Sequence, residues 1–307
     1  MLRAVLADFK AWGGANIITT CDRRLGDITL PADRIICLDP ADHYNTLEQL
    51  AKRCSAALII APESDGILER LSALMEFHGV RLLGSSSGSI AIAANKWHCY
   101  QLFLQAGLPT PATWCVAVRE AEATAEKIGY PLIIKPLDGI GCEGIYLVRN
   151  RASLFLGLKK YKYNKNKLLL QRYIEGQHIS ASLLIAENTI SCVSLNRQAV
   201  KIDRSFSYQG CEVPYICDQQ AEAVSLAKRA VALIPGLRGY VGVDMLLGGN
   251  GCNLIEINPR LTTSYTGLRQ VININMAESI WRAAIKGSLP PKYILSGKAI
   301  INLEDLL

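Results

Sequence analysis

The chain has 307 residues, of which half are apolar and a fifth are charged, and its formal net charge is +6. This length and composition are those of a globular protein with at least two domains. Lys and Arg are scattered except for one dense run, KKYKYNKNK at residues 159–167. A single run of this kind favours a solvated loop over a nucleic-acid site.

Cysteine usage and the lack of targeting segments indicate where the protein works. Ten cysteines are present, none in a CxxC pair, and most lie in apolar runs where Cys packs as a small hydrophobe. No signal peptide opens the chain, and no apolar stretch is long enough to cross a membrane. We therefore expect a cytoplasmic protein with reduced, structural thiols and with neither a membrane nor a nucleic acid as partner.

The first ninety residues alternate between strand-like and helical patterns. Strands are predicted at residues 2–9, 34–39, 57–63 and 81–84. Apolar residues at helical spacing lie between them, namely Leu47, Leu50, Ala51 and Cys54, and then Ile67, Leu68, Leu71, Leu74 and Met75. This alternation predicts βαβ units and a parallel sheet up to about residue 94. No G-x-G-x-x-G follows the first predicted strand, so no dinucleotide is assigned here.

The rest of the chain predicts a small α/β unit followed by a strand-rich lobe. A helix is expected over residues 90–106, ending at Gly107. Residues 112–174 predict strands at 113–118, 131–135, 144–148 and 167–174, with helices at 119–128 and 152–161. Further strands are expected at 180–185, 189–196, 240–248 and 252–258, and a closing helix at about 269–285. GGNG joins the last two strands and is a strong hairpin signal.

The predicted hairpin carries acidic groups where neither strand favours charge. Asp244 lies in VGVDMLLG, and Glu256 and Asn258 lie in LIEIN. Side chains alternate along a strand, so Glu256 and Asn258 share a face, and the tight turn brings Asp244 opposite them. Buried like charges repel unless a cation lies between them, and oxygen donors favour magnesium or manganese. The alternative is a pair of solvated carboxylates on an exposed face.

Three basic groups could serve a phosphate. Lys135 ends an apolar strand and leads into a loop with Gly139, Gly141 and Gly144, whose amides could form an anion-binding nest, although many such turns are plain hairpins. Lys96 opens a predicted helix and by itself could be a surface lysine. Pro259 ends the strand of Glu256, and the permanently charged fork of Arg260 follows. The alternative for this strand end is a polar exit with a surface Arg.

Taken together, these motifs resemble the ATP-grasp superfamily. Lys96 after an LG-S pattern, Lys135 before a glycine loop, QRYIEG, VGVD and EINPR occur in that superfamily's order and spacing. The resemblance covers essentially the whole chain. It implies α/β lobes with a Rossmann-like pre-ATP-grasp domain at 1–94 and an ATP-grasp domain at 95–307. The latter divides into a lid at about 112–173 and a metal- and substrate-binding lobe at about 174–307.

The resemblance also assigns roles to individual residues. ATP would lie between the lid and the carboxyl-terminal lobe, contacted by Lys96, Lys135, Gly139, Gly141, Gly144, Gln171, Tyr173, Ile174 and His178. Asp244, Glu256 and Asn258 would hold two Mg²⁺ (or Mn²⁺) ions. Arg260 would stabilise the transferring phosphoryl group, and Thr263 and Ser264 would line the substrate pocket. His178 departs from the pattern, since it occupies the position at which an acidic residue usually binds ribose.

More narrowly, EINPRLTTSYTGL, SLNRQ and APESDGIL are similar to tyramine–glutamate ligases of methanofuran biosynthesis. This implies an ATP-dependent ligase that forms an acyl phosphate and then an amide, with the γ-carboxylate of L-glutamate and tyramine or tyrosine as substrates. The alternatives are an ATP-grasp amide ligase with another amino-acid or peptide acceptor, and a non-catalytic nucleotide-binding module. A homodimer is one candidate assembly.

Glu63 is a further candidate in the first domain. It lies at the carboxyl end of a predicted parallel strand, the edge at which open α/β sheets bind ligands. Its carboxylate would suit the ammonium group of a substrate. Alternatively it caps the following helix, whose first turn favours negative charge.

Overall fold

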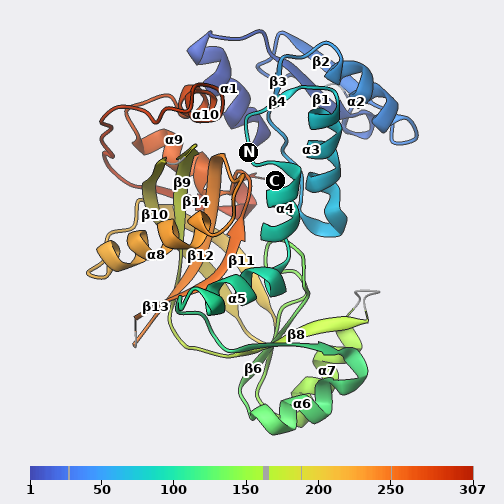
Figure 1. Ribbon diagram of the computed structural model, residues 1–307, viewed down its shortest axis with the longest axis vertical. Coiled ribbons are helices and arrows are strands. Elements are labelled where there is room, and N and C mark those ends of the chain that lie inside the picture. Colours follow the sequence, from blue (N-terminus) through green and yellow to red (C-terminus); the bar gives the residue numbers. More distant parts are fainter. Residues whose placement is uncertain (27, 162–165, 188, 250, 307) are drawn as a thin grey trace.

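The computed structural model describes residues 1–26, 28–161, 166–187, 189–249 and 251–306. Figure 1 shows three parts along the long axis: an amino-terminal α/β domain, a central six-stranded sheet with helices, and at the opposite end a small domain that corresponds to the expected lid and keeps that name below. Four residues of the basic run, 162–165, lie outside the described residues. No helix in the described part of the chain has the length and apolarity to span a membrane.

The chain opens with a helix where the sequence predicted a strand. α1 (Leu2–Trp12) buries Val5, Leu6 and Phe9, a spacing that places the three side chains on one face of a helix. Gly13 ends it in the left-handed conformation, with φ of 68°. The strand prediction was therefore wrong, because the apolar residues in this stretch follow the helical period.

Parallel pairing is confirmed in the remainder of the amino-terminal domain, but in two separate two-stranded sheets. β1 (Ile18–Asp22) pairs with β2 (Arg34–Leu38), and β3 (Ala56–Ala57) pairs with β4 (Arg81–Leu82). The strand β1 had not been predicted. Helices α2 (His43–Ala51) and α3 (Ile67–Phe77) follow the predicted helical spacing.

A break in the expected helix over residues 90–106 positions a functional lysine. The chain forms α4 (Ser87–Ala93) and then α5 (Lys96–Gln105). Asn95 interrupts the helix because its side-chain oxygen accepts hydrogen bonds from the backbone N–H groups of Trp97 and His98. Lys96 thereby becomes the first residue of α5. Gly107, with φ of 64°, follows the end of α5 as the sequence predicted.

The lid has the predicted elements in the predicted order. Its four-stranded antiparallel sheet has the order β5 (Thr113–Ala117), β8 (Lys167–Arg172), β6 (Leu132–Lys135) and β7 (Tyr146–Val148). Helices α6 (Ala121–Ile128) and α7 (Arg151–Lys160) pack on one face around the buried Leu132, Ile134, Leu154 and Leu168. This compact core makes the lid a separate unit that presents the end of β6 to the rest of the molecule.

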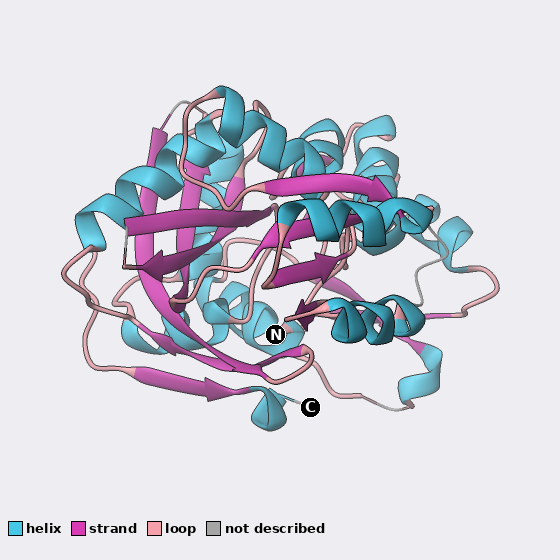
Figure 2. Cartoon of the chain, turned by 90° about the horizontal axis from the view of Figure 1, so that it is seen from below, coloured by secondary structure: helices cyan, strands magenta, loops and turns pink. Residues whose placement is uncertain are grey.

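The carboxyl-terminal lobe is built on a six-stranded sheet with the order β13-β12-β9-β10-β11-β14. Its strands are β9 (Gln177–Ala186), β10 (Thr189–Ile202), β11 (Phe206–Val213), β12 (Gly239–Gly248), β13 (Gly251–Asn258) and β14 (Ala299–Asn302). Alternate residues of β9 enter different cores, with Ile179, Ala181 and Leu183 on one face and Leu184 on the other. The sheet therefore lies between two apolar layers. Figure 2 shows the strands and helices of the chain from below.

Helices supply those two layers. α8 (Gln220–Ala232) packs with α5 on one face, whereas α1, α9 (Ser264–Val271) and α10 (Met276–Lys286) cover the other. The single helix expected at 269–285 is thus two helices, separated before Asn275, whose side chain caps α10. α8, β11 and β14 had not been predicted. All ten cysteines are free thiols.

Candidate active site

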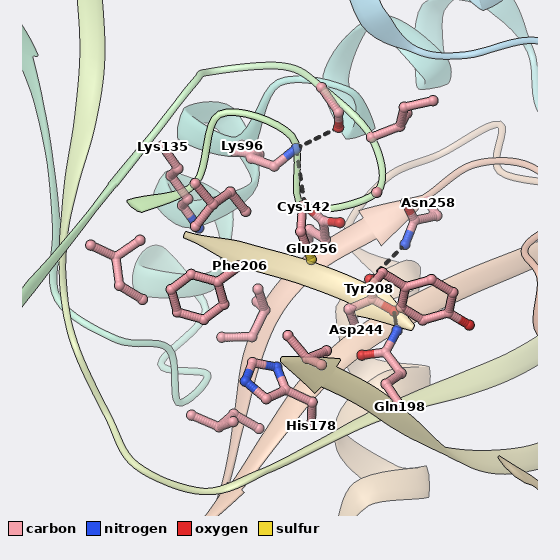
Figure 3. A pocket seen from close by; sticks show the side chains of 18 of the residues that line it. Lys96, Lys135, Cys142, His178, Gln198, Phe206, Tyr208, Asp244, Glu256 and Asn258 are labelled. Atoms are coloured by element: carbon pink, nitrogen blue, oxygen red, sulfur yellow. Dashed lines mark hydrogen bonds and ion pairs between the residues drawn. The ribbon is translucent and has the colours of Figure 1, made fainter. Parts of the chain in front are cut away.

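A cavity lies between the end of the lid sheet and the strands of the carboxyl-terminal lobe (Figure 3). The glycine loop after β6 borders one side, and β11, β12 and β13 border the other. The sequence-predicted residues that line it are Lys96, Lys135, Gly139, Gly141, Gln171, Tyr173, Ile174, His178, Asp244, Glu256, Asn258, Arg260, Thr263 and Ser264. Gly144 and Glu63 are not among its lining residues.

The β12–β13 hairpin brings the acidic groups together, helped by a shift of its register between Asp244 and Met245. Asp244 pairs directly with Glu256, and Asn258 pairs with Gly242 further along the same strands. The amide nitrogen of Asn258 donates to Oδ2 of Asp244 at 3.2 Å, and that of Gln198 on β10 donates to Oδ1 at 3.0 Å. Two carboxylates and two side-chain amides therefore converge on one wall of the cavity (Figure 3).

Burial and neighbouring charges shift the pKa values of the two carboxyl groups in opposite directions. Desolvation, reinforced by repulsion from Glu256, raises the pKa of Asp244 to about 8. Burial alone would raise the pKa of Glu256 as well, but the ammonium groups of Lys96 and Lys135 and the hydrogen bond with Asp244 together outweigh this effect and lower it. The hairpin thus carries one ionised carboxylate next to one that retains its proton near neutral pH. A cation bound beside these two carboxyl groups would favour their ionised forms.

Lys96 joins the glycine loop to the acidic wall. Its ammonium group donates to the carbonyl oxygen of Gly139 at 3.0 Å and lies 2.9 Å from Oε2 of Glu256. Only 8% of Lys96 is exposed, and the carboxylate partner raises its pKa even though burial alone would lower it. Lys96 is therefore a buried, charged residue of the cavity, not the surface lysine of the alternative interpretation.

Lys135 is buried next to a neutral partner. Its ammonium group donates to the side-chain oxygen of Gln171 at 3.0 Å, and the Gln171 nitrogen donates to the hydroxyl of Thr113 at 2.8 Å. Desolvation lowers the pKa of Lys135 to about 8, because the attraction of Glu256 compensates only in part. The side chain of Gln171 therefore orients this lysine toward the cavity, a contact that the sequence did not reveal.

The glycine loop adopts a backbone that few residues other than glycine favour. Gly139, Gly141 and Gly144 have positive φ values of 136°, 61° and 71°, and so does Cys142, at 67°. Successive left-handed residues turn backbone amides inward and produce the concave nests that bind anions. A side chain at Gly141 would meet nothing within 4 Å, so its glycine serves conformation and not close packing.

The far end of the cavity is apolar and aromatic. His178 lies near Phe206 with a centroid separation of 6.2 Å, and both line the cavity together with Tyr173 and Ile174. Burial lowers the pKa of His178, so its imidazole is neutral at physiological pH. The backbone N–H of Tyr173 already donates to Pro131. The backbone N–H of Tyr173 is therefore already hydrogen-bonded within the lid.

Residues after β13 form the remaining wall. Arg260 follows Pro259, donates through Nε to Oε2 of Glu63 at 2.7 Å, and donates through Nη1 to the carbonyl oxygen of Leu261 at 2.9 Å. Thr263 precedes α9, and Ser264 is its first residue. Glu63 makes no side-chain capping bond to the following turn, and its partner in the structure is Arg260.

Several cavity residues carried no individual signal in the sequence. Gln198 contacts Asp244, and Cys142, Phe206 and Tyr208 line the cavity. The stretch SLNRQ could have indicated Gln198, because Asn196 and Gln198 alternate on one face of β10. Phe206 and Tyr208 lie on β11, a strand that was not predicted.

Comparisons with known proteins identify this architecture. A family model described as an ATP-grasp domain matches residues 93–264, and a model described as a pre ATP-grasp 3 domain matches residues 15–90. The chain belongs to the ATP-grasp family. The family and the fold expected from the sequence motifs are thereby confirmed.

Relatives of this ATP-grasp protein include amide-forming ligases. It is 33% identical over 242 residues to the tyramine–L-glutamate ligase of Methanocaldococcus jannaschii, covering 78% of this chain and 67% of that protein. It is 26% identical over 238 residues to a D-alanine–D-alanine ligase of Syntrophobacter fumaroxidans, covering 73% and 76% of the two chains. The chain thus spans about two thirds of the length of the first relative.

The fold is shared with solved structures. The biotin carboxylase domain of the Hydrogenobacter thermophilus 2-oxoglutarate carboxylase, solved with MgADP, superposes with a TM-score of 0.80. Sequence identity is 20%, and the match covers 97% of this chain and 71% of that one. At this identity the likeness establishes the ATP-grasp fold and leaves the substrate to other arguments.

The donor set on the hairpin fits a hard divalent cation. Asp244, Glu256 and Asn258 offer oxygen atoms, which magnesium and manganese prefer. The described residues contain no group of three or more His, Cys, Asp and Glu side chains that could enclose a metal ion. An ion at this wall would therefore complete its coordination with water and phosphate oxygens, as magnesium does at nucleotide sites.

Proposed function

We propose that this protein is an ATP-dependent carboxylate–amine ligase that joins the γ-carboxylate of L-glutamate to tyramine or a related amine. The observation that carries the proposal is the meeting of three cations (Lys96, Lys135 and Arg260) with the Asp244–Glu256 pair in one cavity. Phosphoryl transfer needs positioning and charge neutralisation more than covalent groups of the protein. The tyramine–L-glutamate ligase relative supports the choice of substrates and a place in methanofuran-type cofactor synthesis.

In this proposal ATP lies with its base at the aromatic end of the cavity and its phosphates near the lysines. Tyr173, Ile174 and His178 would surround the base and ribose. Lys96 and Lys135 would contact phosphate oxygens, and the loop from Gly139 to Gly144 would cover them with its backbone amides. Lys96 must then exchange part of its contact with Glu256 for a phosphate oxygen.

Asp244, Glu256 and Asn258 would hold the divalent metal, and two ions are expected beside a triphosphate. Magnesium, or manganese in its place, supplies neutralisation of phosphate charge when bound. The pKa of Asp244 is raised to about 8, so this carboxyl group must release its proton to act as an anionic ligand. Gln198 and Asn258 hold its two oxygens in place.

The residues after β13 would serve the carboxylate substrate. The carboxylate attacks the γ-phosphorus, ADP leaves, and the amine then displaces phosphate from the acyl phosphate to form the amide. Arg260 would stabilise the negative charge of the transferring phosphoryl group. Thr263 and Ser264 stand at the amino-terminal end of α9, where their hydroxyl groups and the helix dipole favour an anionic group of the substrate.

Relatedness to a D-alanine–D-alanine ligase keeps a second substrate class open, in which the acceptor is an amino acid. The test is incubation of the purified protein with ATP, Mg²⁺, L-glutamate and a panel containing tyramine, tyrosine and single amino acids. Mass spectrometry of the products, with fragmentation to distinguish α from γ linkage, should show a glutamyl amide of tyramine or tyrosine. A product only with amino-acid acceptors would move the protein to the second class. ATP hydrolysis without any amide would contradict both.

A further inference from the structure

An ion pair joins the amino-terminal domain to the cavity across 197 residues of sequence. Glu63 lies in the loop between β3 and α3, and its Oε2 accepts from Nε of Arg260 at 2.7 Å. The side chains are 5% and 16% exposed, respectively. A buried pair of this length holds its geometry more firmly than a solvated one, because water does not compete for either group.

The contact that Glu63 makes differs from both roles considered from its place in the sequence. It makes no capping hydrogen bond to the backbone of the turn that follows it. It also does not belong to the residues that line the cavity, so an ammonium group there would meet other side chains first. The structure gives its carboxylate one side-chain partner among the described residues, Arg260.

The guanidinium of Arg260 is held at two of its three nitrogens. Glu63 takes Nε and the carbonyl oxygen of Leu261 takes Nη1, whereas Nη2 has no protein partner in the described part of the chain. Among the described residues, every fully buried side-chain nitrogen or oxygen has a hydrogen-bond partner, so an atom without one is not fully buried. Nη2 is therefore accessible, and Arg260 lines the cavity. Two anchors fix the plane of the fork and leave a donor for a ligand.

We propose that Glu63 is a positioning residue, which fixes the guanidinium of Arg260 so that its Nη2 meets the transferring phosphoryl group. This inference rests on the proposed function, since it assigns Arg260 to that group. A flexible arginine would lose side-chain entropy when the transition state forms, and Glu63 removes that cost beforehand. The amino-terminal domain thereby contributes to catalysis through a residue that does not touch the substrate.

The turn that carries Glu63 is itself well anchored. The N–H of Gly66 donates to the carbonyl of Glu63 at 3.2 Å, and that of Leu68 donates to Pro62 at 3.0 Å. The N–H of Asp65 donates to the carboxylate of Asp138, just before the glycine loop, at 3.2 Å. Because these hydrogen bonds hold the turn, they also hold the carboxylate of Glu63 in place. The bond from Asp65 to Asp138 links the same turn to the start of the glycine loop.

The test compares Glu63→Gln with a matched control, Asp8→Asn. Asp8 is also a buried acid of the amino-terminal segment paired with an arginine of the carboxyl-terminal lobe, Arg269 at 2.7 Å, but it lies outside the cavity. Affinities of both variants are measured for MgADP with aluminium fluoride, which mimics the transferring phosphoryl group, and for a non-hydrolysable ATP analogue. Melting temperatures are recorded in parallel.

We expect Glu63→Gln to weaken binding of the aluminium fluoride complex by about 10- to 100-fold and to change binding of the ATP analogue less than about twofold. Asp8→Asn should lower the melting temperature and leave both affinities unchanged. Arg260→Lys should reproduce the loss, and adding Glu63→Gln to it should weaken binding no further. In turnover assays, Glu63→Gln should lower kcat and leave each KM unchanged.

Three outcomes would overturn the positioning role. These are unchanged affinity of Glu63→Gln for the mimic, an equal loss in Asp8→Asn, or a raised KM for one amino substrate at unchanged kcat. The binding measurements need no carboxylate or amine substrate. If the amine panel yields no amide while the pattern of affinities holds, the substrate assignment fails and the positioning role stands.

Discussion

The ammonium group of Lys96 lies 2.9 Å from Oε2 of Glu256, directly beside the Asp244 carboxyl group that pairs with Glu256 across the hairpin. In the structure this lysine supplies positive charge to a buried carboxylate that otherwise would be costly to ionise. We propose that a metal ion and phosphates share these two groups during the reaction. In this proposal the same three residues neutralise one another in the structure and serve the nucleotide during the reaction.

The first prediction concerns Glu256. Glu256→Gln should lower kcat by more than about 100-fold, because the site loses an anionic metal ligand and Lys96 loses its charged partner. Circular dichroism should show the fold retained, since the amide fills the same space. Glu222→Gln is a suitable control, because Glu222 also contacts β13, accepting from the N–H of Cys252 at 3.1 Å, but does not line the cavity. Near-normal turnover by Glu256→Gln would remove the metal role.

The second prediction concerns the protonation of Lys135. Its pKa is lowered to about 8, and contact with phosphate requires the ammonium form. The value of kcat/KM for ATP should therefore fall by about tenfold per pH unit well above that pH. Below it the value should also decline, because Asp244, whose pKa is raised to about 8 as well, then keeps its proton. Gln171→Glu places a carboxylate beside Lys135, raises its pKa and should move the fall to higher pH.

A control variant separates charge from hydrogen bonding at this position. Gln171→Met removes the 3.0 Å hydrogen bond to Lys135 without adding a charge, so the fall should not move to higher pH. A profile of kcat/KM that is the same for the wild type and Gln171→Glu would show that Lys135 does not govern ATP binding.

Much of the site could be predicted because local signals fixed it. The GGNG signal predicted the pairing of β12 with β13. Continued without a break from Gly248 opposite Gly251, this register would place Ile255 opposite Asp244, and the shift between Asp244 and Met245 brings Glu256 there instead. The end of β6 and the glycines after it likewise placed Lys135 at the cavity. Side-chain alternation and turn chemistry act over a few residues, so they can be recognised in one sequence.

Other relationships depend on contacts that no local pattern encodes. The helix α1 was misread because an apolar pattern over three turns is short, and its burial depends on α10, more than 260 residues away. The pairing of Glu63 with Arg260 joins two domains and left no trace in either segment. The orientation of Lys135 by Gln171 required the pairing of β6 with β8.

The third prediction concerns the glycine loop. Backbone amides of residues 138–144 should exchange with deuterium more slowly, by about tenfold or more, when a non-hydrolysable ATP analogue and Mg²⁺ are bound, because closing loops are weakly held when empty. The turn at residues 118–120 directly follows β5 in the same lid and serves as an internal reference. Equal protection of both segments would indicate general stabilisation of the lid and would argue against phosphate contact by the loop.

The fourth prediction concerns His178 and the ribose. Burial lowers the pKa of His178, so a neutral imidazole would face the ribose hydroxyl groups. A carboxylate accepts stronger hydrogen bonds than a neutral group, so His178→Glu should lower the KM for ATP by about fivefold. The same variant should show no gain with 2′,3′-dideoxy-ATP, which lacks both hydroxyl groups. Steady-state kinetics with the two nucleotides decide the matter, and an equal change for both would mean that His178 contacts another part of the nucleotide.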